Sequence, residues 1–137
     1  MSLLSVKNLR VTFDTEAGRV EAVRGVSFSL GRERLGIVGE SGSGKTMTGR
    51  SVLRLIRPPG RIEADEMTFD GIDLMAASQK QMRALRGPRM AMVMQDPKYS
   101  LNPVMKVGAQ LTEGLRLRDR LSKKDAYAKA IEAPTAV

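Results

Sequence analysis

Residues 39–46 read Gly-Glu-Ser-Gly-Ser-Gly-Lys-Thr, and no other stretch of the chain narrows the possible folds as far. They match the phosphate-loop pattern G-x-x-x-x-G-K-[ST] at every required position. An apolar run at 35–38 precedes the loop and a helix-compatible segment follows it, which is the strand–loop–helix context that the pattern needs. The sequence therefore predicts an α/β protein in which this loop binds the phosphates of a nucleoside triphosphate.

The residue types in this loop suit an anion. Glycine at three positions lets the backbone curl so that successive N–H groups point inward, and the loop then enters a helix whose N-terminus favours phosphate. Lys45 supplies a charge for the β and γ phosphates, and the Thr46 hydroxyl is a ligand for Mg²⁺. The alternative is a Gly/Ser-rich turn that matches by accident. The predicted nucleotide-binding residues are Gly39, Glu40, Ser41, Gly42, Ser43, Gly44, Lys45 and Thr46.

Composition excludes several other chemistries. The chain contains no cysteine and no histidine, so disulfides, thiolate metal sites and the commonest general base are absent. No run of about 18 apolar residues is present, and we predict no transmembrane segment. The net charge of +8 is compatible with nucleic acid, an anionic membrane surface or polyphosphate. With three Phe, two Tyr and no Trp to stack on bases, we predict no nucleic-acid partner.

The apolar pattern places strands on both sides of the loop. Alternation over 4–13 and 26–30 predicts two half-buried strands, joined by the turn-like residues 14–18 as an antiparallel pair. The runs 35–38 and 90–94 lack polar alternation, which is typical of parallel strands covered on both faces. Residues 62–69 predict one further strand, turned by Asp70-Gly71.

Helix signals occupy the rest of the chain. The helix after Thr46 is expected to include Leu55 and Ile56 and to stop at 57–60. Ser78 with Gln81 predicts a capping box for a short helix through Arg86. Further helices are predicted to start at Asn102, with Pro103 at the first position, and at Ser122 with Asp125, the last one ending at Pro134.

With these motifs in place, residues 1 to about 130 resemble the ATP-binding subunit of an ABC transporter, and within that family the oligopeptide/dipeptide importer group. The first match is the strand pair, "LSVKNLRVTF" and "AVRGVSFSL", ahead of the phosphate loop. The second is Gln95, at the end of the second apolar run, where the family has its Q-loop glutamine. The third is "QDPKYSLNPV", which resembles the QDP-x-x-SLNP segment of the peptide importers.

The resemblance implies a fold and a set of roles. The expected fold is a RecA-like P-loop NTPase core with an N-terminal antiparallel β subdomain over residues 1–94, followed by the Q-loop and the start of a helical subdomain over 95–137. The cofactors would be ATP and Mg²⁺, with Gln95 touching the metal or the attacking water. Phe13 stands where the family stacks an aromatic ring on adenine, and a role in the strand core is equally open.

The resemblance also implies an ATPase that couples ATP binding and hydrolysis to import. Its partners would be transmembrane permease subunits and a second ATP-binding subunit, identical or different. It would be peripheral, on the cytoplasmic face of the inner membrane. The cargo stays open among peptides, nickel, sugars and glutathione.

One motif has a rival interpretation. Apolar residues before Asp96 also fit a Walker B strand, in which the aspartate holds the metal through water. We favour the Q-loop because Pro97 stands where the catalytic glutamate would follow, and because 97–103 fits the importer segment.

The sequence departs from the family in its second half. It contains no LSGGQ-type signature, no Walker B strand with its glutamate and no switch histidine. We expect an N-terminal half, truncated before the signature motif and Walker B, that binds nucleotide without hydrolysing it. The alternatives are a small P-loop phosphotransferase and a non-catalytic ATP-binding remnant.

Overall fold

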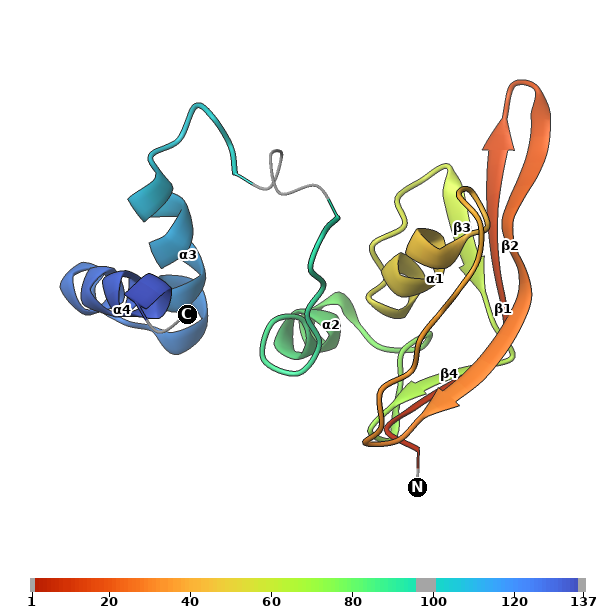
Figure 1. Ribbon diagram of the computed structural model, residues 1–137, viewed down its shortest axis with the longest axis horizontal. Coiled ribbons are helices and arrows are strands. Elements are labelled where there is room, and N and C mark those ends of the chain that lie inside the picture. The colour runs from red at the N-terminus through yellow and green to blue at the C-terminus, as the bar shows by residue number, and fades with distance from the viewer. Residues whose placement is uncertain (1, 96–100, 136–137) are drawn as a thin grey trace. The chain divides into compact units, whose positions relative to one another are not determined.

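The computed structural model describes residues 2–95 and 101–135, with side chains described as far as residue 132. The chain divides into two compact units, residues 1–92 and 93–137. The first unit contains an antiparallel sheet with two short helices, and the second contains two helices (Figure 1).

The sheet of the first unit is built around its first strand. Strand β1 (Leu4–Thr15) forms a hairpin with β2 (Gly18–Leu30) along one side. Along the other side, its first half pairs with β4 (Glu66–Phe69) and its second half with β3 (Gly60–Glu63). Strand β5 (Ile72–Asp73) continues the sheet from β4, and every pairing is antiparallel. The predicted antiparallel pair ahead of the phosphate loop is confirmed.

The alternation of β1 is interrupted at one residue. Leu4 and Val6 are buried, and the next buried residues are Leu9 and Val11, so the buried face skips one position. Asn8 lies between the two pairs with φ 49°, and the register with β2 shifts between Val6 and Leu9. This irregularity returns the apolar side chains to the same face of the sheet.

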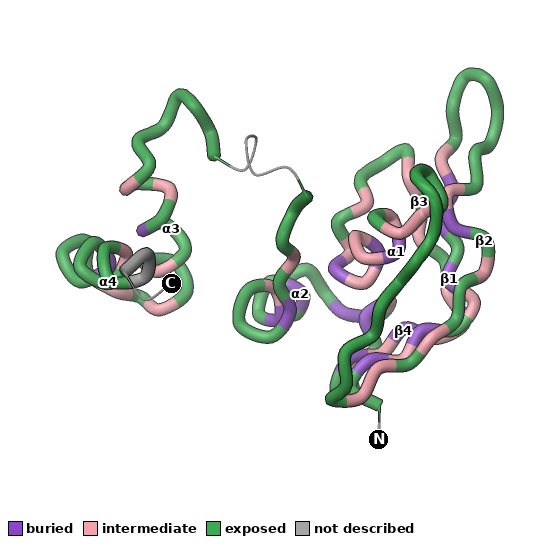
Figure 2. Tube along the Cα trace, viewed as in Figure 1, coloured by how far each residue is buried: buried purple, intermediate pink, exposed green. Residues whose placement is uncertain are grey.

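The core lies between this sheet and two helices, α1 (Lys45–Val52) and α2 (Gln79–Leu85). Figure 2 shows the buried positions gathered on β1, β4 and the helices. The predicted capping box of α2 is confirmed, since the Ser78 hydroxyl accepts from the Gln81 amide and the Gln81 side chain accepts from the Ser78 amide. Met82 and Leu85, three positions apart on α2, are both buried.

Both predicted parallel strands are wrong. Residues 35–38 and 90–94 have no strand conformation, and Val38 and Val93 are each 96% exposed. A strand needs a neighbouring strand to pair its amides and carbonyls, and among the described residues the only pairing here is a single parallel bridge from Arg86 to Met90.

Two other predicted elements have different boundaries in the structure. The predicted strand over 62–69 is two strands, because β3 and β4 pair with consecutive halves of β1. Helix α1 ends at Val52, so Leu55 and Ile56 lie beyond it.

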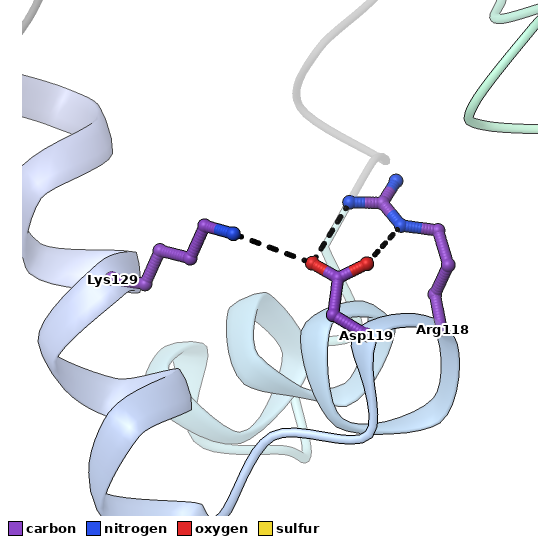
Figure 3. Close-up of polar contacts among 3 residues, drawn as sticks. All are labelled: Arg118, Asp119 and Lys129. Carbon is purple, nitrogen blue, oxygen red and sulfur yellow. Dashed lines mark hydrogen bonds and ion pairs between the residues drawn. The ribbon is translucent and has the colours of Figure 1, made fainter.

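The second unit is a pair of helices, α3 (Val107–Asp119) and α4 (Lys123–Thr135). Thr112 and Ala126 are its buried residues among those described. At the end of α3, the Asp119 carboxylate accepts from Arg118 and from Lys129 of α4 (Figure 3). The hydrogen bond from Arg118 is the main reason that the pKa of Asp119 is lowered.

The predicted helix starts in this unit are partly wrong. Helix α3 begins at Val107 and not near Asn102, because the Asn102 backbone bonds to the Gln110 side chain and its own side chain accepts from the Val104 amide, forming a turn. The Ser122 hydroxyl accepts from the Asp125 amide at 3.1 Å, as expected for the start of α4. Pro134 falls inside the bounds of α4. In the described part of the chain, the helices are too short or too polar to cross a membrane.

Candidate phosphate-binding site

The predicted loop lies at the N-terminus of α1, and that helix end has no side-chain cap. Gly44 is the N-cap residue with φ 92°, and it makes no capping hydrogen bond from a side chain. The first helical bond runs from the Thr48 amide to the Gly44 carbonyl at 2.8 Å, so the amides of Lys45, Thr46 and Met47 come before it. The first turn also has no acidic residue. This end of α1 therefore offers amides and positive dipole to an anion.

Lys45 folds back across the loop that precedes it. Its ammonium group donates to the carbonyl oxygens of Gly39 at 2.7 Å and Glu40 at 2.6 Å, and lies 3.4 Å from the Ser43 hydroxyl. All three acceptors are neutral. A phosphate oxygen in the same place would accept the same hydrogen bond and add the attraction between opposite charges, which the neutral carbonyls do not supply.

The loop needs glycine at position 44 for steric reasons. A Cβ atom on Gly44 would lie 2.5 Å from the Ala22 carbonyl oxygen of β2, a backbone atom that cannot rotate away. A Cβ on Gly39 would lie 2.5 Å from the Ser43 hydroxyl, which can rotate to another position. The close approach of β2 fixes the base of the loop against the sheet.

A hollow beside the loop was not predicted from the sequence. It is lined by side chains of β2, of the segment 35–38 and of the phosphate loop, and Lys45 and Thr48 border it. Val26 and Phe28 of β2 face it. The alternation of β2 predicted that these side chains face the core, and nothing in the pattern marked them as neighbours of the loop.

The predicted metal ligand from this loop is Thr46, which lies exposed in the first turn of α1. Within the described residues, no three or more acidic side chains gather at one place as a metal-binding group. A single hydroxyl fits Mg²⁺, which keeps several waters and takes further ligands from phosphate oxygens. The donor set therefore suits a metal that arrives with a nucleotide.

Phe13 lies in β1, half-buried, opposite Gly60 of β3. A Cβ atom on Gly60 would be 2.6 Å from the edge of the Phe13 ring, so the ring covers this glycine. Phe13 also packs against the core cluster. This position is compatible with a core role and leaves the adenine-stacking role as a prediction.

Gln95 belongs to the second unit, where it is exposed at a bend. The phosphate loop and Phe13 belong to the first unit. Asp96, the Walker B alternative, and residues 97–100 of the importer segment lie outside the described residues.

Comparison with known proteins identifies the protein family of this chain. Residues 23–135 match the family model described as ABC transporter, and the chain belongs to that family.

Several individual relatives that are similar to this chain are named as peptide-transport proteins. The oligopeptide transport ATP-binding protein OppD of Bacillus subtilis (strain 168) is 48% identical over 132 residues, which cover 95% of this chain and 37% of that protein. OppD of Escherichia coli (strain K12) is 44% identical over 137 residues, or 99% of this chain and 40% of that protein. The dipeptide transport ATP-binding protein DppD of Bacillus subtilis is 45% identical over 126 residues, or 90% of this chain and 38% of that protein. The chain thus spans about 40% of the length of these relatives.

Proposed function

We propose that this chain is the ATP-binding part of an ABC importer for oligopeptides or dipeptides. The observation that carries the proposal is the position of the Lys45 ammonium, held by the Gly39 and Glu40 carbonyls beside the uncapped N-terminus of α1. The peptide-transport names of the relatives support the choice of cargo.

In this proposal the phosphate loop belongs to a RecA-like P-loop core. The amides at the start of α1 and the Lys45 ammonium hold the β and γ phosphates, which replace the loop carbonyls as acceptors. Thr46 holds Mg²⁺ through its hydroxyl, and the metal when bound neutralises charge on the phosphates. Phe13 is the candidate for stacking on adenine.

The remaining roles extend the proposal beyond the phosphate loop. Gln95 would orient the attacking water or touch the metal, and hydrolysis would be coupled to transport. Permease subunits and a second ATP-binding subunit are the proposed partners, with the protein peripheral at the cytoplasmic face of the membrane. The match of residues 23–135 to the ABC transporter family supports each of these roles.

Titration calorimetry with Mg-ATP tests the phosphate loop directly. Lys45→Ala should weaken binding by about 1–3 kcal/mol, the value of a charge-assisted contact. Arg50→Ala is the matched control, because it removes a positive charge from the last turn of the same helix. Unchanged affinity in Lys45→Ala would show that residues 39–46 do not bind the phosphates.

The same titration separates the metal ligand from the phosphate ligands. Thr46→Ala should weaken binding of Mg-ATP by about 1–3 kcal/mol and leave binding of ATP in a metal chelator nearly unchanged. An equal loss with and without Mg²⁺ would show that Thr46 acts on the nucleotide or the helix and not on the metal.

A further inference from the structure

Just after the C-cap of helix α1, Arg54 stands where chains usually have glycine. The Arg54 amide donates to the Ser51 carbonyl and the Leu55 amide to the Arg50 carbonyl, both at 2.8 Å, which is the Schellman arrangement. Arg54 occupies the left-handed position of this motif with φ 51°. A side chain in that conformation costs about 1–2 kcal/mol, and the contacts of the Arg54 side chain offset this cost.

The Arg54 side chain reaches residues 74–77, the segment that leads into α2. Its Nη1 atom donates to the Leu74 carbonyl at 3.1 Å and also to the Ala77 carbonyl. Leu74 and Ala77 are both buried, and Ala77 immediately precedes the capping residue of α2. Arg54 therefore links the end of α1 to the start of α2.

A second arginine makes the reverse connection. Arg86, the C-cap residue of α2, donates through Nε to the Leu53 carbonyl at 2.7 Å and through Nη2 to the Arg54 carbonyl at 3.0 Å. Its guanidinium group thus meets the negative end of α1. Burial, followed by the charges of Arg54 and Arg83, lowers the pKa of Arg86. The two arginines together form a clamp between the end of α1 and both ends of α2.

Helix α1 also packs on the core, through Met47 and Val52. The helix runs for only 8 residues, and its buried side chains, Thr48 and Ser51, donate their hydroxyls to carbonyls of the loop and of the same helix. Helices of this length have little stability alone and depend on tertiary contacts. The clamp lies about 12 Å from Lys45, since the helix rises about 1.5 Å per residue.

We infer that Arg54 and Arg86 are positioning residues for nucleotide binding, which hold α1 so that its N-terminal amides and Lys45 meet the phosphates. The inference rests on the proposed function of the phosphate loop. Because a rigid helix transmits a tilt at one end to the other, loosening the clamp displaces the phosphate-binding groups. Hydrogen bonds weaken steeply as their distance and angle leave the favoured range, so a displaced helix start would hold phosphate less tightly.

The experiment measures the affinity of the full 137-residue chain for Mg-ATP at a temperature well below the melting point of every variant. Arg86→Met keeps the length of the side chain and removes its donors, and we expect about tenfold weaker binding. Arg86→Lys restores one charged donor and should recover part of the affinity. The control is Arg83→Met, which removes an equal charge from an exposed position of α2 and should stay within about twofold of the parent.

Arg54→Gly separates positioning from stability. Glycine fits the left-handed position, so the backbone motif stays and its strain is relieved, while the bonds to Leu74 and Ala77 are lost. We expect weaker binding of Mg-ATP without a matching fall in melting temperature. A purely structural role would lower the melting temperature and leave the affinity of the folded protein unchanged.

The outcomes distinguish the two proposals. If the parent chain does not bind Mg-ATP, the proposed function fails. If the parent binds and both Arg86→Met and Arg54→Gly bind equally well, the proposed function stands and the clamp inference is overturned. If Arg86→Met does not fold, Arg86→Lys and Arg54→Gly decide, and parental affinity in both overturns the inference.

Discussion

Alanine at position 44 should lower the free energy of unfolding far more than alanine at position 42, although both glycines belong to the same loop. Gly44 has φ 92° and Gly42 has φ 81°, so either substitution forces a side chain into a conformation that favours glycine. They differ in their surroundings. A Cβ on Gly44 would lie 2.5 Å from the Ala22 carbonyl oxygen, whereas a Cβ on Gly42 would have nothing within 4 Å.

The expected magnitudes follow from these contacts. The positive φ alone costs about 1–2 kcal/mol for an alanine, and this is the whole expected loss for Gly42→Ala. Gly44→Ala adds about 1–3 kcal/mol for forcing β2 and the loop apart. The free energy of unfolding should therefore fall by about 2–5 kcal/mol in Gly44→Ala.

Urea denaturation followed by far-UV circular dichroism measures both values. Calorimetry with Mg-ATP on the folded variants adds a second readout, because displacing Gly44 also displaces the first amides of α1. If Gly44→Ala costs no more than Gly42→Ala, then the Ala22 carbonyl does not support the loop and the reasoning fails.

Three further predictions concern other parts of the chain. In a chimera that joins this chain to the remaining residues of a relative, Gln95→Ala should keep ATP affinity and lower transport-coupled turnover, if the proposed function holds; loss of Mg²⁺ binding in Asp96→Asn, with Gln95→Ala unaffected, would favour the Walker B alternative. Ser78→Ala should lower the free energy of unfolding by about 1 kcal/mol in urea, and an unchanged value would mean that the capping box contributes nothing. Arg118→Met should raise the pKa of Asp119 toward its ordinary value in an NMR titration. Because that folded-state pKa is lowered, the stabilisation is present above the ordinary pKa of aspartate and is lost as pH falls through the lowered one; an unmoved titration in Arg118→Met would contradict the assigned cause.

The local sequence determined the elements whose signals are complete within a few residues. The β1–β2 hairpin follows from two alternating runs and the turn between them. The start of α2 follows from Ser78 and Gln81, which satisfy each other's backbone groups wherever the helix packs. The predicted helix behind residues 39–46 is present and begins at Lys45, while the binding of phosphate by this loop stays a prediction.

The tertiary structure decided what depends on distant partners. An apolar run such as 35–38 favours burial but supplies neither a covering surface nor a hydrogen-bond partner, so whether it is a buried strand depends on neighbours elsewhere in the chain. Here it is not a strand, and Val38 is exposed. Asn102 has the side chain of a helix cap, yet Gln110 engages its backbone and α3 starts later. The connections from Arg54 and Arg86 to backbone carbonyls 20 to 33 positions away leave no pattern in the sequence. Carbonyl acceptors exist at every residue, and only the tertiary structure selects which of them an arginine meets.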